Sequence, residues 1–293
     1  MGRFWRYRGM SRLLPRRASL APYTPPVTTL PIGDLPGWTQ IVADDFNYNY
    51  PIGSIQSDNN GELLVGAAAY AELHDKFTFY PDGWNTTWGG KQGKDTSGNT
   101  VTLQTKYYPS KTVYFENSCC KIYQHSEDIG GFMTALGATV KPKLPGGAYK
   151  LGPYGRYQFR MRATGVSASP SYLGWVPLAI DSANWPGNGE FDWPEGDIAS
   201  PVAGNYHPAN PTNVTQHVNS GEDPFAWNIY TVEWIPGNLK WYCNSALRLN
   251  TSDRVPTGGL AVLFQVGSMD TQPDPAVIGT VEIDWVAIWN YTP

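Results

Sequence analysis

The chain has little cysteine, with only Cys119, Cys120 and Cys243 among its 293 residues. Neighbouring cysteines rarely bond each other because the ring they would close is strained, so at most one disulfide, to Cys243, can form. One thiol is then left over. The three residues also lack the spacing of a structural zinc site. The sequence therefore argues against a disulfide-rich scaffold and leaves buried free thiols as the alternative to a single disulfide.

Long apolar runs are also lacking. No stretch approaches the roughly 18 consecutive apolar residues of a transmembrane helix, so no membrane span is predicted. Near the N-terminus, arginines and Pro15 interrupt every candidate hydrophobic segment of a secretory signal. We therefore expect an extracellular protein exported by a route without that signal, a component of a virus particle such as a phage tail, or a wrongly assigned start.

Charged residues are few, at 16%, and they are unevenly placed. Six arginines lie within the first 17 residues, before the first acid at Asp34, and residues 18–293 carry 15 basic against 25 acidic side chains. This acidic body argues against nucleic acid as the main partner. Residues 1–36 form a basic, proline-rich arm, which we expect to be disordered, a leader, or a segment that docks on another protein.

The residues that are abundant indicate β structure. The chain holds 31 Gly, 25 Pro, 18 Tyr and 12 Trp, and no stretch sustains a helical apolar period. About a dozen short alternating runs are joined by Gly/Pro turns, and 155–162, 203–207 and 228–234 are examples. The sequence predicts an all-β fold, a two-sheet antiparallel sandwich, as one domain over residues 37–293. Residues 47–110 are expected to form long, ordered loops.

The most informative segment reads Glu190-Phe191-Asp192-Trp193-Pro194-Glu195. Alternate side chains of a strand share a face, so Glu190 and Asp192 point the same way while Glu195 would point the other way. A β-bulge adds one residue and re-aims the side chains beyond it, which would bring all three acids to one surface. Pro194 fits a bulge because proline cannot donate to a sheet ladder.

Three acids on one face repel each other unless a ligand, a metal or a shared proton offsets the cost. Two carboxylates about 5 to 5.5 Å apart are what retaining glycoside hydrolysis requires, one as nucleophile and one as acid and then base. An acidic strand-to-loop segment or a calcium site is the alternative explanation of the hexapeptide taken alone.

Several segments in order resemble glycoside hydrolase family 16, the laminarinase-like branch of the concanavalin A-like jelly rolls. The segments are similar to that family's first strand, its "YGRFEAR" strand, its catalytic segment and two later strands. They are, in the same order, 43–46, 154–162, 185–195, 230–234 and 281–286. The resemblance runs from Trp38 to Tyr291 and implies a jelly-roll β-sandwich.

The resemblance also implies roles for individual residues. Glu190 would be the nucleophile, Glu195 the general acid and base, and Asp192 would tune protonation between them. No cofactor or metal is needed for that chemistry. Similar proteins often carry a structural calcium ion, which implies Asp284 as a calcium ligand. The candidates for sugar contacts are Trp185, His207, Trp175 and Arg160.

These observations predict a retaining endo-β-glycosidase acting on β-1,3-linked glucan or a related β-linked polysaccharide. A different class of protein explains the same sandwich, namely a carbohydrate-binding or adhesion protein that does not cleave. The presence of all three acids argues against this alternative.

Overall fold

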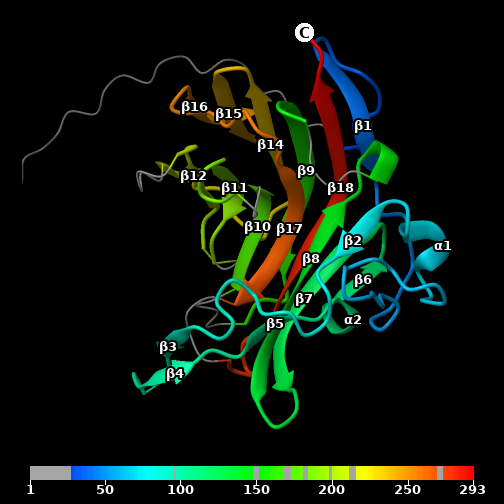
Figure 1. Cartoon of the computed structure of the whole chain (residues 1–293), viewed down its shortest axis with the longest axis vertical. Coiled ribbons are helices and arrows are strands. Elements are labelled where there is room, and N and C mark those ends of the chain that lie inside the picture. Colours follow the sequence, from blue (N-terminus) through cyan, green and yellow to red (C-terminus); the bar gives the residue numbers. More distant parts are fainter. Residues whose placement is uncertain are drawn as a thin grey trace, which may run out of the picture.

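The computed structural model describes residues 28–95, 97–147, 152–167, 173–180, 184–197, 200–210, 216–268 and 273–293. Strands dominate these residues (Figure 1). The α-helices among them are short, α1 (Tyr70–Leu73) and α2 (Pro109–Thr112). The all-β sandwich predicted from the composition is therefore confirmed.

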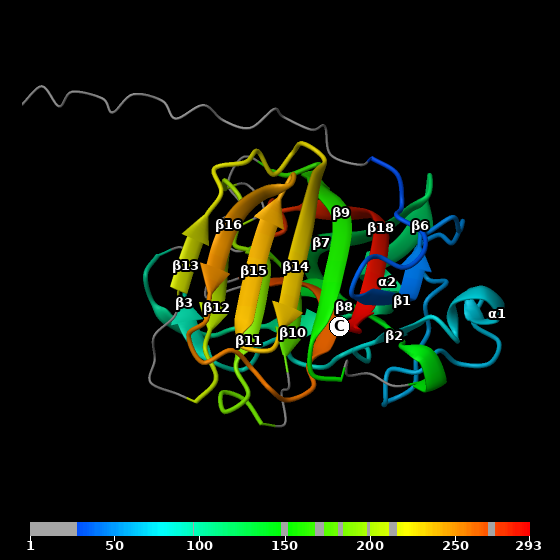
Figure 2. The same ribbon diagram turned by 90° about the horizontal axis from the view of Figure 1, so that it is seen from above.

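The strands form two layers. The inner sheet runs in the order β13 (Gln216–Asn219), β12 (Ala203–His207), β11 (Glu190–Glu195), β10 (Leu173–Ile180), β17 (Ala261–Ser268) and β8 (Met133–Pro142), with β2 (Phe77–Phe79) beside β8. The outer sheet runs in the order β7 (Cys119–Asp128), β18 (Gly279–Tyr291), β9 (Gly155–Thr164), β14 (Asn228–Ile235), β15 (Asn238–Cys243) and β16 (Ala246–Thr251). Two further strands, β1 (Trp38–Asp44) and β6 (Val113–Glu116), pair with β18 and β7. Figure 2 shows β14, β15 and β16 lying over β10, β11 and β12.

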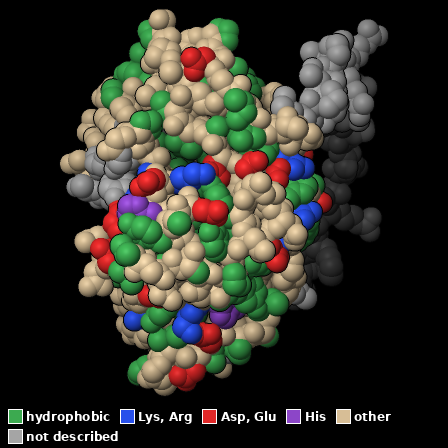
Figure 3. Space-filling model, turned by 90° about the vertical axis from the view of Figure 1, so that its right-hand side faces the viewer, with side chains coloured by type: hydrophobic (Ala, Val, Ile, Leu, Met, Phe, Trp, Pro, Cys, Tyr) green, Lys and Arg blue, Asp and Glu red, His purple; other side chains and the backbone are tan. Residues whose placement is uncertain are grey.

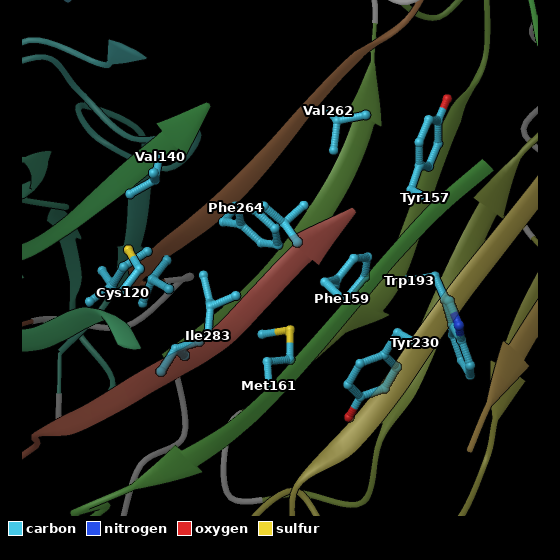
Figure 4. Close-up of a cluster of buried hydrophobic side chains, with 14 of the residues drawn as sticks. Cys120, Val140, Tyr157, Phe159, Met161, Trp193, Tyr230, Val262, Phe264 and Ile283 are labelled. Carbon is cyan, nitrogen blue, oxygen red and sulfur yellow. The ribbon is translucent and has the colours of Figure 1, made fainter. Parts of the chain in front are cut away.

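The core fills the space between the two layers. Phe159 and Met161 project from β9 and Ile283 from β18, and they meet Phe264 of β17 (Figure 4). Phe159 and Phe264 pack edge to face with ring centroids 5.5 Å apart. Period-two alternation in β9 and β15 thus buries one face of each strand, whereas β18 beside β9 is buried on both faces over most of its length.

Strand β11 is anchored to the core by its two aromatic residues. Phe191 packs edge to face on Trp234 at 5.4 Å, and Trp193 stacks on Trp241 at 5.3 Å. The indole Nε1–H of Trp193 also donates to the carbonyl of Tyr242 at 3.0 Å. Truncating a fully buried aromatic residue typically costs about 3–5 kcal/mol. These contacts therefore fix which face of β11 is turned away from the core.

The bulge predicted in β11 is present. Asp192 pairs with Asn205 of β12, yet Glu195 pairs with Ala203, so three steps along β11 match two steps along β12. The extra residue falls in the Trp193–Pro194 segment. Gly204 is the residue of β12 opposite it, and a Cβ there would lie 2.4 Å from the carbonyl oxygen of Asp192. A residue without a side chain is therefore required opposite the bulge.

The loops predicted over residues 47–110 contain more regular structure than expected. Besides α1 and β2, they hold the short strands β3 (Gln92–Lys94), β4 (Thr100–Thr102) and β5 (Thr105–Tyr107). Strand β5 pairs in parallel with β8, whereas the other strand pairs of the described sandwich are antiparallel. Three-residue strands are too short to produce a readable alternation, which explains the difference.

The predicted arm at residues 1–36 ends inside the described fold. The side chain of Gln40 donates to the carbonyl of Pro31 at 2.8 Å, and Trp289 of β18 donates to the carbonyl of Gly33 at 3.0 Å. Residues 31–35 therefore pack against β1 and β18. The arginine-rich residues 1–27 lie outside the described residues.

All three cysteines are free and buried, as in the alternative without a disulfide. No helix in the described part of the chain is long and apolar enough to cross a membrane. On the side that carries β1, β6 and α1, basic side chains lie beside acidic ones (Figure 3). Ion pairs from these elements include Lys76–Asp44 at 3.1 Å and Lys121–Glu116 at 2.7 Å.

We predict that Gly204→Ala destabilises the fold by about 1–3 kcal/mol, because the new methyl group would overlap Asp192 and the Trp193 ring. Urea unfolding measures the difference. Gly152→Ala is the matched control, since a Cβ at that position meets nothing within 4 Å. Equal stabilities of the two variants would show that β12 tolerates a side chain opposite the bulge.

Candidate active site

Glu190 and Asp192 lie on the face of β11 that is turned away from Phe191 and Trp193. Across the ladder, Glu190 pairs with His207 and Asp192 pairs with Asn205, and cross-strand partners share a face. The bulge brings Glu195 close enough for its charge to act on both other acids. The structure therefore gathers the three predicted acids and the predicted His207 on one surface.

Glu190 is held by the exposed Trp185. The indole Nε1–H of Trp185 donates to Oε2 of Glu190 at 2.6 Å, while 52% of the Trp185 surface stays open to solvent. Burial raises the pKa of Glu190 to about 7, and the negative charge of Glu195 adds to the effect. The donor from Trp185 acts in the other direction because it stabilises the ionised form.

Asp192 is the most enclosed of the three acids, with 2% of its surface exposed. Burial first, and then the charges of Glu190 and Glu195, raise the pKa of Asp192 well above its ordinary range. Its Oδ1 atom is buried without a hydrogen-bond donor. An acceptor left in this way next to a second carboxyl group is satisfied when the two share a proton.

His207 lies beside Asp192, with Nε2 3.2 Å from Oδ2. Burial lowers the pKa of His207 below its ordinary value, so the imidazole is neutral at neutral pH. In the tautomer that carries its proton on Nε2, it donates a hydrogen bond to Asp192. His207 was predicted as a sugar contact, and the structure places it beside an acid of the site.

Glu195 has partners that the sequence analysis missed. The side-chain amide of Asn205 donates to Oε2 of Glu195, and Oδ1 of Asn205 lies 3.0 Å from Nδ1 of His217 on β13. The run 203–207 was recognised as a strand, and its alternation places Asn205 on the same face as His207. That parity was the available signal for Asn205. The contact with His217 depends on how β13 pairs with β12, which no local pattern indicates.

Three residues of the site have atoms placed so that they could bind a metal ion. Glu190, Asp192 and His207 each offer an atom, and these atoms lie within 4.8 Å of one another. Two carboxylates with an imidazole are a ligand set for a transition metal rather than for calcium, which prefers oxygen ligands only.

The prediction of Arg160 as a sugar contact is wrong. Arg160 is on β9 of the outer sheet, where Phe159 and Met161 face the core, so its side chain lies on the far side of the sandwich from the acids. There its Nη1 pairs with Asp284 at 2.5 Å, and its guanidinium lies 4.5 Å from the ring centroid of Trp227.

Asp284, the predicted calcium ligand, pairs through its carboxylate with the guanidinium of Arg160. Its role in binding calcium, which takes six to eight oxygen ligands, stays a prediction. Asp284 is the extra residue where β18 shifts register against β9 between Ile283 and Trp285. Its acidic side chain therefore has a structural explanation, as the partner of Arg160.

The fourth predicted sugar contact, Trp175, lies partly outside what the structure describes. Its backbone is in β10 opposite Val266 of β17. Its side chain is not among the described ones.

Comparison with known proteins identifies the fold. No family model matches the chain. The clotting factor G alpha subunit of Tachypleus tridentatus is 27% identical over 180 residues, which cover 58% of this chain and 24% of that protein. The chain thus corresponds to about a quarter of that relative's length.

Solved structures match over most of the chain. The laminarinase from Rhodothermus marinus is 17% identical with a TM-score of 0.58, over 88% of this chain and 100% of that one. A Zobellia galactanivorans protein solved with laminaritriose and laminaritetraose is 13% identical with a TM-score of 0.58, over 86% and 99%. A Mycobacterium tuberculosis protein described as a pseudo β-1,3-glucanase is 16% identical with a TM-score of 0.56, over 86% and 98%. The chain therefore shares the β-sandwich fold of these laminarinase-like structures.

The raised pKa of Glu190 predicts a stability that depends on pH. The protonated form of Glu190 favours the folded state fully below its ordinary pKa of 4.5, and this contribution is lost as the pH rises through about 7. Glu190→Gln removes the ionisation, so we expect the variant to exceed the wild type at pH 9 by on the order of 2–3 kcal/mol. Denaturant unfolding at pH 5 and pH 9 measures this. A stability difference that is the same at both pH values would contradict the burial of Glu190.

Proposed function

We propose that the chain is a retaining endo-β-glycosidase that hydrolyses β-1,3-linked glucan or a related β-linked polysaccharide. The observation that carries the proposal is the bulge in β11, because it aims Glu195 at the surface that Glu190 and Asp192 already share. Retaining hydrolysis requires two carboxyl groups on opposite sides of the glycosidic bond, and a regular strand would turn one of them away.

In the first step, Glu190 attacks the anomeric carbon as a carboxylate while Glu195 gives its proton to the departing glycosidic oxygen. The bond to that oxygen breaks, and a covalent glycosyl-enzyme forms on Glu190. In the second step, Glu195 takes a proton from water as the water attacks the same carbon and Glu190 leaves. Each carboxyl group then has its starting protonation.

Asp192 supports the charge changes on Glu190. Because its pKa is raised, Asp192 keeps its proton when Glu190 is ionised. Protonated Asp192 can then donate a hydrogen bond to the carboxylate of Glu190. His207 in turn orients Asp192 through Nε2. Trp185 is exposed and next to Glu190, which suits an aromatic ring that stacks on a sugar.

The preference for β-1,3-glucan rests on similarity rather than on a group in the site. The structures that match most of the chain include a laminarinase and a complex with laminari-oligosaccharides. The alternative, a protein that binds polysaccharide without cleaving it, draws on the pseudo β-1,3-glucanase that shares the fold.

A reducing-sugar assay on laminarin, mixed-linkage β-glucan and β-galactan tests the proposal. We expect the wild type to release reducing ends from laminarin and Glu190→Gln to lose at least about a thousandfold in kcat, because the nucleophile is gone. Asp284→Asn is the matched control, since Asp284 follows a glutamate in the same Glu-x-Asp pattern but lies on the outer sheet. An inactive wild type that still binds laminarin would instead establish the binding protein.

The pH dependence of kcat/KM gives a second test. Attack requires ionised Glu190, so we expect kcat/KM of the wild type to fall as the pH drops through about 7. Trp185→Phe keeps an aromatic ring but removes the donor that favours ionised Glu190, so the acidic limb should move to higher pH. Initial rates at low laminarin concentration from pH 4 to pH 9 measure the shift. An acidic limb that stays in place or moves to lower pH would show that Trp185 does not govern Glu190.

A further inference from the structure

A row of polar side chains crosses three strands next to the bulge. Asp192 of β11 pairs with Asn205 of β12, and Asn205 pairs with His217 of β13. Cross-strand partners share a face, so Asn205 and His217 lie on the face that carries the acids. Neither residue is needed by the double displacement as derived above.

Asn205 reaches Glu195 because of the bulge. The backbone partner of Glu195 is Ala203, but its carboxylate accepts a hydrogen bond from the amide nitrogen Nδ2 of Asn205. The amide can offer a donor or an acceptor in this direction, depending on how it is turned. A donor toward Glu195 is the arrangement that compensates a carboxylate.

His217 fixes the turn of that amide. Its Nδ1 lies 3.0 Å from Oδ1 of Asn205, and in the tautomer with a proton on Nδ1 it donates to this oxygen. With Oδ1 engaged by His217, Nδ2 is left to face Glu195. His217 itself is exposed on the edge strand β13, so its side chain has little part in packing.

The three acids thus have separate partners in this structure. Trp185 donates to Glu190, His207 lies beside Asp192, and Asn205 donates to Glu195. The donor to Glu195 is in turn contacted by the imidazole of His217.

We propose that Asn205 and His217 are positioning residues for Glu195, which hold its carboxyl group where it must meet the glycosidic oxygen. The inference rests on the proposed function, in which Glu195 is the general acid and base. Partners that orient the ligands of metal sites are typically worth about 10–100-fold in activity, and we expect an effect of the same order here.

The role of the leaving group makes the proposal testable. A sugar hydroxyl is a poor leaving group and needs the proton of Glu195, whereas 2,4-dinitrophenolate departs without protonation. Loss of the amide should therefore lower kcat/KM on laminarin and spare it on a 2,4-dinitrophenyl β-laminaribioside. The parameter kcat/KM reports the steps up to glycosyl-enzyme formation, so the later action of Glu195 as a base does not enter.

We expect Asn205→Leu, which keeps the branched shape but not the donor, to lose about 10–100-fold in kcat/KM on laminarin and less than about threefold on the activated substrate. His217→Leu should show the same pattern with a smaller loss. His217→Asn should recover most of the laminarin activity, because its amide nitrogen can take the place of Nδ1. His74→Leu is the control, because His74 caps the C-terminus of α1 and has no part in the site. We expect it to leave kcat/KM unchanged on both substrates.

Each outcome separates the two claims. If the wild type cleaves neither substrate, the proposed function fails and the inference fails with it. If the wild type cleaves both, and Asn205→Leu loses equally on both or on neither, the inference is overturned while the function stands. Because His217 is exposed, its variants give this comparison even if Asn205→Leu does not fold.

Discussion

The arrangement of the three acids on the inner sheet depends on the one extra residue of the bulge in β11. Between Asp192 and Glu195, β11 takes three steps while β12 takes two, and this offset turns Glu195 toward the other two acids. Burial, and then the charges of the neighbouring acids, raise the pKa of Glu190 to about 7 and raise the pKa of Asp192 well above its ordinary value. The bulge therefore adds the charge of Glu195 to the burial that already raises both pKa values.

The rest of the sandwich holds this feature in place. Trp193 and Phe191 extend from one face of β11 into the core. The other face of the strand carries the acids. On β12, Gly204 leaves room for the bulge and Asn205 follows it directly. Preorganisation of this kind means that the acids need little rearrangement when a substrate arrives.

Sequence patterns predicted the features that depend on local chemistry. Alternation with a proline in the acidic hexapeptide was enough to predict the bulge, and the composition was enough to predict a β-sandwich. The prediction that Arg160 contacts a sugar is wrong because of a limit of such patterns. Its strand was read correctly, with Tyr157, Phe159 and Met161 on one face, but alternation does not say to which sheet a strand belongs. The same limit hid His217, whose importance depends on the pairing of β13 with β12.

The stereochemistry of cleavage tests the central claim most directly. If the bulge sets Glu190 and Glu195 for double displacement, proton NMR of a laminari-oligosaccharide digest must show the β-anomer as the first product, before mutarotation. Appearance of the α-anomer first would mean a single inverting displacement by water. It would contradict the role of Glu190 as a nucleophile and with it the account given for the bulge.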